Sequence, residues 1–286
     1  MNASAISATA VLSTLLLTAC TEESGPEAFT SFGAAPEDGT VTISGSARTA
    51  AFDDVSNVVS ISQVAYDDSA FLDITYETGA VTRVQIADTA ANIDLNADAG
   101  ASFNDAGALV VGRSADGRTL VLMADPDTTG FDYQTYSLWL TGYGTSAGEI
   151  GAGSFGAATD AAAIPSFGSA TYAGTATGLA SDGIEYLGTI SNVQVTADFG
   201  SGTASVTSSG TELFELDTLA NAGARAGLDF IGSGPISGAT FDASVGGSLT
   251  VGNVDGEFYG PGAEEVGGTF ATSGSGITHV GSFGAD

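Results

Sequence analysis

The feature that most constrains this chain is the alternation of apolar and polar residues, broken at short intervals by glycine and aspartate. In the segment NVQVTADFGSGTASV, the apolar residues at 193, 195, 197 and 199 fall on one face of an extended strand, and the polar residues between them fall on the other. Gly200-Ser201-Gly202 then turns the chain into Ala204 and Val206. Beyond residue 40 almost nothing has the period of a helix. We therefore expect an all-β sandwich or barrel, and the missing helices exclude a parallel α/β layout.

Turn signals and a repeat divide the chain. FLDITYETGAVTRVQI reads as a hairpin about Thr78-Gly79, and ALVVGRSADGRTLVLM as another about Asp116-Gly117. The pentapeptide GSFGA occurs at 153–157 and again at 281–285, each time at the end of a strand-rich block. We predict a β-rich domain over 41–157, a linker over 158–168 that contains Pro165, and a second β domain over 169–286. The alanine run in the linker could instead form one helical turn.

The first twenty residues predict export and lipidation. They carry no charged side chain, and their apolar stretch is too short to span a bilayer, which is typical of a cleaved signal peptide at 1–19. Leu17-Thr18-Ala19-Cys20 resembles the bacterial lipobox, so Cys20, the only cysteine, is the predicted lipidation site. Residues 20–40 would then be a flexible tether, and Thr21 favours the outer membrane by resemblance to lipoprotein sorting. An ordinary secretory signal with an incidental cysteine is the alternative.

The charge of the chain limits its partners. Five basic residues against 34 acidic residues give a formal net charge of −29. Nucleic acid and anionic membrane surfaces are therefore poor partners, because both bind through Lys and Arg. The acidity either keeps the protein soluble or steers a basic partner toward it.

Chemistry-bearing motifs are sparse. Gly144-Thr145-Ser146-Ala147-Gly148 matches the nucleophile-elbow pattern, but no helix follows it, and His279 is the only histidine. The run Asp125-x-Asp127-x-x-Gly130 lacks the glutamate of a calcium loop, and one histidine with one cysteine cannot build a zinc site. We therefore expect no catalytic residue, no metal and no cofactor.

The stretch DGEFYGPGAEEVGGTF combines aromatics, a Gly-Pro-Gly corner, two glutamates and a Gly-Gly pair. It resembles the last hairpin of the eight-stranded β-barrel in transferrin-binding protein B and its relatives, and SATYAGTATGLA and VTADFGSGTASV resemble earlier strands of that barrel. YSLWLTGYG resembles the end of the family's smaller handle domain. The resemblance implies a handle-like antiparallel β domain followed by an eight-stranded antiparallel barrel. Its signature residues here are Gly256, Phe258, Tyr259, Gly260, Pro261, Gly262, Glu264, Glu265, Gly267, Gly268 and Phe270.

The residues of this hairpin also have physical roles. Gly260-Pro261-Gly262 favours a sharp corner, because proline fixes φ and glycine accepts positive φ. We expect Ala263 to Val266 to form one exposed helical turn carrying Glu264 and Glu265, which as neighbours cannot act as an acid/base pair. Gly267 and Gly268 would permit the close approach that barrel closure needs, with Phe258 and Phe270 inside. The stretch is therefore interpreted as a closure seam rather than a ligand site.

The resemblance implies a lipid-anchored, non-catalytic binding protein of the outer membrane, facing the surface or the periplasm. Relatives capture host transferrin, haemoglobin, haem or complement regulators, often beside an integral transporter, so a protein or haem ligand and such a transporter are the expected partners. A structural or adhesive surface lipoprotein without a soluble ligand is one alternative. Direct haem binding through His279 or a tyrosine is another, although a lone histidine beside a C-terminal strand is more often an ordinary surface residue.

Overall fold

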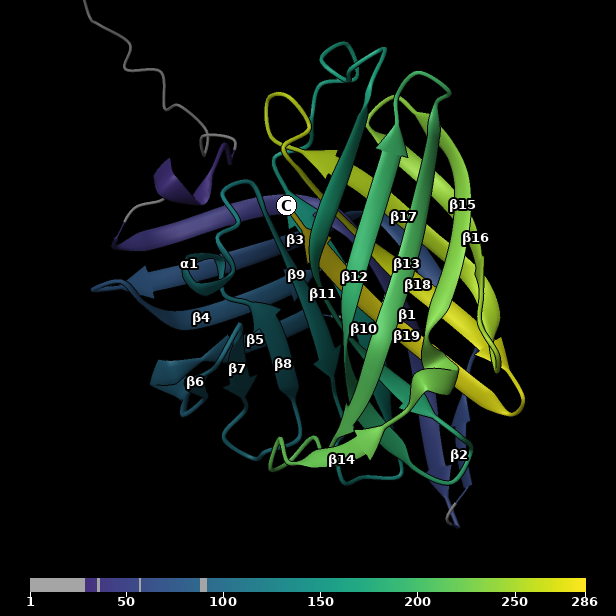
Figure 1. The fold of residues 1–286 in the computed structure, drawn as a ribbon. Helices are drawn as coiled ribbons and strands as arrows, with labels where there is room; N and C mark the ends of the chain where they lie inside the picture. Colours follow the sequence, from purple (N-terminus) through teal and green to yellow (C-terminus); the bar gives the residue numbers. More distant parts are fainter. Residues whose placement is uncertain (1–28, 35–36, 57, 88–91) are drawn as a thin grey trace, which may run out of the picture.

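The computed structural model describes residues 29–34, 37–56, 58–87 and 92–286, and in this range the protein is all-β. The signal peptide and Cys20 lie outside the described residues. Two antiparallel sheets follow one another along the chain and pack side by side (Figure 1). None of the described helices is long and apolar enough to cross a membrane.

The first sheet has the strand order β5-β4-β3-β1-β10-β9-β8-β7-β6, and β2 pairs with β1 outside this path. Its two ends, β5 and β6, are consecutive in the chain, and the sheet curls around a core that includes Ile43, Leu72 and Trp139. The elements of this part are η1 Phe32–Ala34, β1 Gly39–Val55, β2 Val58–Ile61, β3 Ala65–Glu77, β4 Ala80–Ala87, β5 Asn92–Asn96, η2 Ala97–Ala99, β6 Ser102–Ala106, β7 Leu109–Arg113, β8 Leu120–Ala124, α1 Pro126–Thr129, β9 Gln134–Leu140 and β10 Ala147–Gly156.

The second sheet closes into an eight-stranded antiparallel barrel. Strands β11, β12, β13, β15, β16, β17, β18 and β19 each pair with two neighbours, and the pairs β12–β13 and β11–β19 complete the ring. The short strand β14 pairs with β13 outside the ring. The elements are β11 Ser169–Ser181, β12 Tyr186–Asp198, β13 Thr203–Phe214, β14 Asn221–Ala224, η3 Ala226–Leu228, β15 Phe230–Ser237, β16 Thr240–Gly246, β17 Val251–Tyr259, β18 Glu265–Gly274 and β19 Ile277–Ala285.

The alternating residues of the sequence fill the barrel. Those predicted to share one face, at 193, 195, 197, 199, 204 and 206, are all buried in one cluster, as are Phe241, Ala243 and Val245. Phe258 lies 5.6 to 6.0 Å from the rings of Tyr172, Phe199 and Phe241. The barrel therefore has a packed interior rather than a lumen, as an eight-stranded ring allows.

The predicted turns form. Thr78 and Gly79 have φ values of 52° and 77° between β3 and β4, the left-handed pair that a tight hairpin needs. Gly117 (φ 70°) turns β7 into β8. In the segment between the sheets, the alanine run makes a single turn, in which Ala163 N–H donates to Asp160 O at 2.7 Å.

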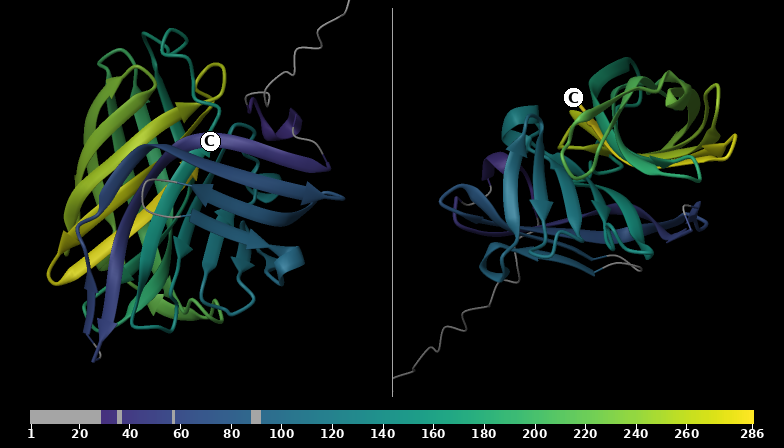
Figure 2. Two further views of the ribbon diagram at one scale, coloured as in Figure 1. Left: turned by 180° about the vertical axis from the view of Figure 1, so that it is seen from behind. Right: turned by 90° about the horizontal axis from the view of Figure 1, so that it is seen from below.

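The two sheets are joined by a buried layer. Strands β9 and β10 of the first sheet lie against β18 and β19 of the barrel, and Figure 2 shows the ring seen along its axis with the first sheet beside it. Leu138 and Ile150 from the first sheet share one apolar cluster with Leu179 and Val280 from the barrel. Polar bonds cross the same layer: the Oγ of Ser282 donates to Ser137 O at 2.7 Å.

Candidate functional site

The β17–β18 hairpin, which carries the sequence motif, faces two environments. Gly256, Phe258, Gly268 and Phe270 point into the barrel, where a Cβ on Gly268 would lie 2.8 Å from both Gly256 Cα and the Phe283 ring. Tyr259, Glu265 and Gly267 point outward against the first sheet. Strand alternation thus gives half of the motif to the barrel core and half to the layer between the sheets.

This placement corrects the interpretation of the hairpin as a closure seam. The ring closes through β11–β19 and β12–β13, whereas β18 lies between β17 and β19 and docks its outer face on the first sheet. A Cβ on Gly267 would collide with Oε1 of Gln134 and lie 2.6 Å from Oγ of Ser154. Tyr259 is fully buried, and its hydroxyl lies 2.9 Å from the same Ser154 Oγ. Position 267 requires glycine because the first sheet approaches the backbone there too closely for a side chain.

Glu265 is the second correction. The expected exposed helical turn is absent from the described hairpin, because β18 begins at Glu265 and its side chain is only 3% exposed. Its Oε1 accepts the backbone N–H of Asp132 at 2.6 Å, and the N–H of Tyr133 donates to the same carboxyl at 3.2 Å. Burial raises the pKa of Glu265 to about 7, against the opposing effect of these two N–H donors. A residue expected on the surface therefore ties the two sheets together.

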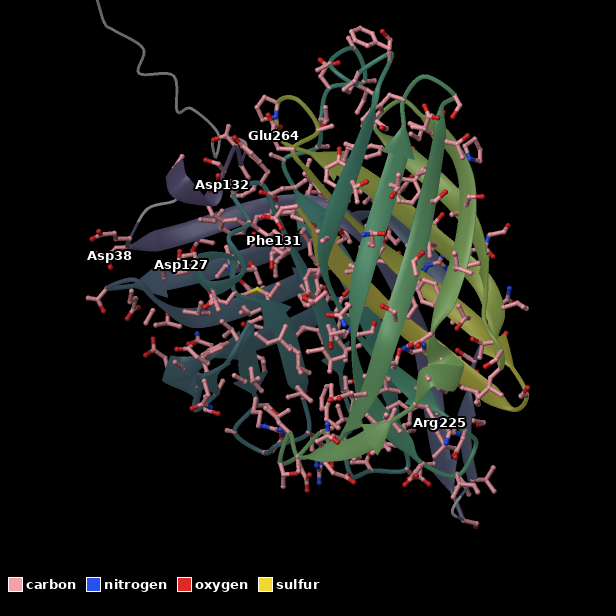
Figure 3. All side chains as sticks on the ribbon, viewed as in Figure 1. Asp38, Asp127, Phe131, Asp132, Arg225 and Glu264 are labelled. Atoms are coloured by element: carbon pink, nitrogen blue, oxygen red, sulfur yellow. The ribbon has the colours of Figure 1, made fainter. Side chains whose placement is uncertain are left out.

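The remaining motif residues form the corner itself. Gly260 (φ 87°) and Ala263 (φ 63°) adopt left-handed conformations, and a Cβ on Gly260 would lie 2.7 Å from the Tyr133 ring. Glu264 is exposed, and its Oε2 accepts the N–H of Gly262 at 2.8 Å. Figure 3 shows Glu264 and Asp132 on neighbouring segments at one end of the molecule.

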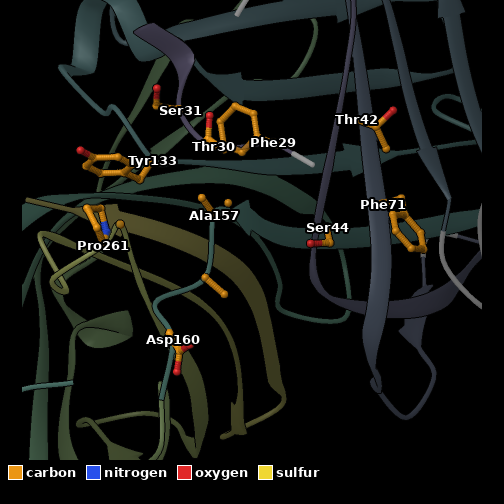
Figure 4. A pocket seen from close by; sticks show the side chains of 13 residues that line it. Phe29, Thr30, Ser31, Thr42, Ser44, Phe71, Tyr133, Ala157, Asp160 and Pro261 are labelled. Atoms are coloured by element: carbon orange, nitrogen blue, oxygen red, sulfur yellow. The ribbon is translucent and has the colours of Figure 1, made fainter. Parts of the chain in front are cut away.

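An open groove of about 860 Å³ lies at this end, between the corner and the first sheet (Figure 4). Phe71 on β3 and its cross-strand partner Ser44 on β1 form one wall, and Tyr133 and Pro261 lie on the other side. Phe71 is 49% exposed. The full lining consists of Phe29, Thr30, Ser31, Thr42, Ser44, Phe71, Tyr133, Gly156, Ala157, Ala158, Asp160, Gly260 and Pro261.

Backbone hydrogen bonds hold the groove in shape. Ala157 N–H donates to Tyr133 O, and Gly260 N–H donates to Ala157 O, each at 2.9 Å. The Thr159 hydroxyl donates to Gly260 O at 2.7 Å, and Phe32 N–H donates to Asp132 O at 2.7 Å. Segments from both sheets and from the start of the described chain are thereby fixed to one another. A ligand would meet a preformed surface, which lowers the entropy cost of binding.

The lining of the groove is aromatic and polar. It offers aromatic rings, hydroxyl groups and one carboxylate, Asp160, and it has no histidine, cysteine or basic side chain among its lining residues. Within the described ranges, no three His, Cys, Asp or Glu side chains are grouped so as to hold a metal ion. Stacking on rings and hydrogen bonds to hydroxyls suit a protein segment.

The weaker sequence motifs lie elsewhere. Gly144 to Gly148 form the β9–β10 loop and the start of β10, and Asp125 caps α1 by accepting the N–H of Asp127. His279 is 1% exposed inside the barrel, where its Nε2 lies 2.9 Å from the Thr189 hydroxyl and its ring meets Phe270 edge-on at 4.8 Å. The expectation of a surface histidine was wrong, because residue 279 occupies a position of β19 whose side chain faces the barrel interior.

The family match covers the barrel, whereas the similar solved structures cover most of the chain. Residues 164–286 match the family described as the C-lobe and N-lobe β-barrels of Tf-binding protein B. No curated protein matches the sequence significantly. Among solved structures, a transferrin binding protein B variant from Haemophilus parasuis Hp5 is 12% identical, with a TM-score of 0.43 over 88% of this chain and 76% of that one.

Two further structures are similarly distant. The isotype 1 transferrin binding protein B from serogroup B Neisseria meningitidis is 15% identical, with a TM-score of 0.41 over 78% of this chain and 52% of that one. The haemoglobin receptor HpuA from Kingella denitrificans is 12% identical, with a TM-score of 0.39 over 88% of this chain and 87% of that one. Structural similarities with TM-scores this low support no conclusion about function. The match to the family of transferrin-binding protein B β-barrels covers residues 164–286, and it is a similarity of that part of the chain.

Proposed function

We propose that this chain is a lipid-anchored, non-catalytic outer-membrane protein that captures a protein ligand. The observation that carries the proposal is the family match over residues 164–286, since the family is named for a protein that binds transferrin. The packed barrel interior supports binding on the outside of the molecule, because Phe258, Phe270 and Phe283 leave no internal space for a ligand.

The preformed groove is the proposed contact surface. Exposed Phe71 offers an apolar contact, and the hydroxyls of Thr42 and Ser44 lie beside it on β1. Aromatic side chains surrounded by polar groups are typical of the centre of a protein interface. We expect the ligand to be a host or environmental protein of the iron-acquisition type.

Binding is tested with purified iron-loaded host transferrin and with haemoglobin, each passed over the immobilised protein. Phe71→Ser should weaken capture at least tenfold, and the matched control Ile231→Ser, which removes a side chain that is 64% exposed on β15, should leave it unchanged. If neither protein binds the unaltered chain, the iron-acquisition proposal fails. An equal loss in both variants would refute the groove as the contact surface.

Anchoring is tested separately through Cys20. Cys20→Ser should leave an unprocessed precursor that no longer fractionates with membranes, because several acyl chains supply the anchoring free energy. If the variant is still processed and still pellets with outer membranes, the lipoprotein proposal is wrong. Protease shaving of intact cells would distinguish a surface-facing from a periplasm-facing protein.

Direct haem binding is the second candidate function. His279 does not favour it, because its ring is buried and its Nε2 contacts Thr189. Tyr133, which lines the groove, is the tyrosine that we would test first. Adding haemin and recording the Soret band, with Tyr133→Phe as the control, tests this candidate; an unshifted band would exclude it. A structural or adhesive role would remain if neither proteins nor haem bound.

A further inference from the structure

A second cavity, which we call the junction cleft, lies between the two sheets and shares no lining residue with the groove. Its volume is about 600 Å³, and every residue that lines it lies within the described ranges. One wall comes from β1, β3 and the segment between β2 and β3, and the other is the outer face of β16 to β19. The lining consists of Arg48, Ile61, Ser62, Gln63, Val64, Tyr66, Asp242, Val251, Gly252, Asn253, Asp255, Ala271, Thr272, Ser273 and Thr278.

A buried ion pair joins the two walls of the junction cleft. The Nη2 atom of Arg48 on β1 donates to Oδ2 of Asp255 on β17. Arg48 is only 8% exposed, and its Nε atom has no hydrogen-bond partner within the described ranges. Leaving a donor of a buried charged group unpaired is costly. The cleft therefore contains a fixed cation whose hydrogen-bonding capacity is not fully used by the protein itself.

Tyr66 adds an aromatic surface beside this pair. It is the cross-strand partner of Arg48, and the guanidinium carbon of Arg48 lies 5.4 Å from the centre of the Tyr66 ring. Such a contact between a cation and a ring is attractive and holds the ring in place. Tyr66 nevertheless remains 48% exposed. A ligand would meet a ring that is already positioned, so little conformational entropy is lost on binding.

The barrel wall of the cleft carries polar groups that folding alone does not explain. Asp242 on β16 and Asp255 on β17 are cross-strand partners, and like charges in that position destabilise a sheet. Arg48 neutralises Asp255, whereas Asp242 forms no ion pair within the described part of the chain. The side-chain amide of Asn253 donates to Oδ1 of Asp242 at 3.5 Å. Carboxylate acceptors and an amide donor thus lie side by side on an exposed face.

We infer that the junction cleft binds a neutral saccharide. Each sugar hydroxyl both donates and accepts hydrogen bonds, so neighbouring hydroxyls match a carboxylate beside an amide, here Asp242 and Asn253. The C–H groups on the face of a sugar ring pack against an aromatic side chain, which Tyr66 supplies. The volume of the cleft falls within the range of roughly 300 to 1,000 Å³ that small-ligand sites occupy.

The charge of the cleft selects a neutral sugar among the possible small ligands. Two carboxylates, Asp242 and Asp255, against the single guanidinium of Arg48 make the lining net negative, which disfavours an acidic sugar. An apolar ligand would cover these polar groups without giving them hydrogen bonds. The inference rests neither on the groove nor on the lipid anchor.

The test records saturation transfer by NMR from the intact protein to three neutral sugars, lactose, maltotriose and triacetylchitotriose, and to the acidic sugar trigalacturonate. At least one neutral sugar should bind with a Kd of about 1 mM or tighter, and trigalacturonate should not bind. If no neutral sugar receives saturation at about 10 mM, the inference is overturned. Equal binding of trigalacturonate would also overturn it.

Two substitutions locate the binding on the cleft. Tyr66→Leu and Asp242→Ala should each weaken it about tenfold, because one removes the ring and the other a carboxylate acceptor. Phe167→Leu, which removes an aromatic side chain that is 82% exposed, and Asp105→Ala, which removes an exposed carboxylate of β6, are the matched controls. Both controls should leave the affinity unchanged. Equal loss in the cleft variants and the controls would contradict the placement of the sugar.

A cationic peptide is the competing occupant, because Asp242 has no basic partner. If tetralysine displaces the sugar, and its own binding is lost in Asp242→Ala but kept in Tyr66→Leu, the cleft is a site for a basic segment and the inference fails. The source of the sugar is tested with a glycoprotein that carries neutral glycans. Capture that disappears when the glycans are removed enzymatically would support an attached glycan, whereas capture through the cleft that survives their removal would overturn the inference.

Discussion

The Oε1 atom of Glu265 accepts the backbone N–H of Asp132 at 2.6 Å, and this bond joins residues 133 positions apart in the sequence. Tyr133 N–H donates to the same carboxyl. One buried side chain of the barrel thereby fixes the segment that enters β9 of the first sheet. The same segment lines the groove through Tyr133, so the shape of the proposed contact surface depends on Glu265.

The raised pKa of Glu265 makes this junction sensitive to pH. The folded state holds the proton until about pH 7, whereas the ordinary pKa of a glutamate carboxyl is 4.5. The stabilisation from protonated Glu265 is therefore complete below about pH 4.5 and is lost as the pH rises to about 7. The loss corresponds to about 3 kcal/mol for a shift of this size.

Glu265→Gln should remove this dependence, because the amide oxygen still accepts the N–H groups without ionising. Both proteins are unfolded with urea at pH values from 4.5 to 8. The free energy of unfolding of the variant should rise relative to that of the unaltered protein as the pH increases. Exposed Glu264→Gln is the matched control and should run parallel to the unaltered protein. A constant difference between Glu265→Gln and the unaltered protein at every pH would contradict the prediction.

His279 should behave in the opposite way. Burial lowers the pKa of His279 to about 4. As the pH falls below about 6.5, the histidine of the unfolded chain becomes protonated, whereas that of the folded protein stays neutral. Stability should therefore fall as the pH drops from about 6.5 to 4. Because the chain has a single histidine, its ring signals in the NMR spectrum report this group alone. They should stay in the neutral position at pH 5, and a midpoint near 6.5 would show that the ring is hydrated.

The packing of the barrel predicts how strongly each of three substitutions lowers the free energy of unfolding. Phe270→Ala should destabilise the protein by about 3 to 5 kcal/mol because it empties a core position. Gly268→Val should cost at least about 1 to 3 kcal/mol, since its side chain would meet Gly256 Cα and Phe283. Glu264→Gln should change the free energy of unfolding by under about 0.5 kcal/mol. Urea midpoints in the reverse order would show that the hairpin serves binding rather than structure.

The division of the chain at 158–168 remains a prediction about independent folding. A fragment of residues 169–286 keeps the whole ring and its packed interior, so we expect dispersed amide signals. The fragment would also expose Leu179, Tyr259 and Val280 to solvent, because the first sheet covers them in the full chain. The fragment should therefore self-associate, and Val280→Ser should restore a monomer in sedimentation experiments. A disordered fragment would mean that the two sheets fold as one unit.

The sequence predicted the strands and the barrel well because a strand in a closed ring has one face inside. Val193, Val195 and Ala197 alternate with polar residues, and that pattern alone places them in the core. The tight turn at Thr78-Gly79 was equally local, since Gly79 readily adopts the positive φ that such a turn needs.

The layer between the sheets could not be predicted in the same way. Tyr259, Glu265 and Gly267 occupy the outer face of a barrel strand, where sequence alternation predicts solvent. Their burial depends on Gln134, Ser154 and Asp132, more than 100 residues earlier, and no local pattern encodes that contact. The groove is made at the same junction. Its residues come from segments scattered along the chain, so only the folded structure brings them together.

Closure of the barrel through β11 and β19 has a consequence for how the protein reaches its final state. Gly174, near the start of the barrel sequence, pairs with Ala285, near its end. The ring therefore cannot close during synthesis until almost all of the barrel strands are available, and contacts between such distant segments make folding slow. Until then, β11 and β19 each present an unpaired edge that another chain can join. A chaperone that shields these two strands would protect the newly made protein from aggregation.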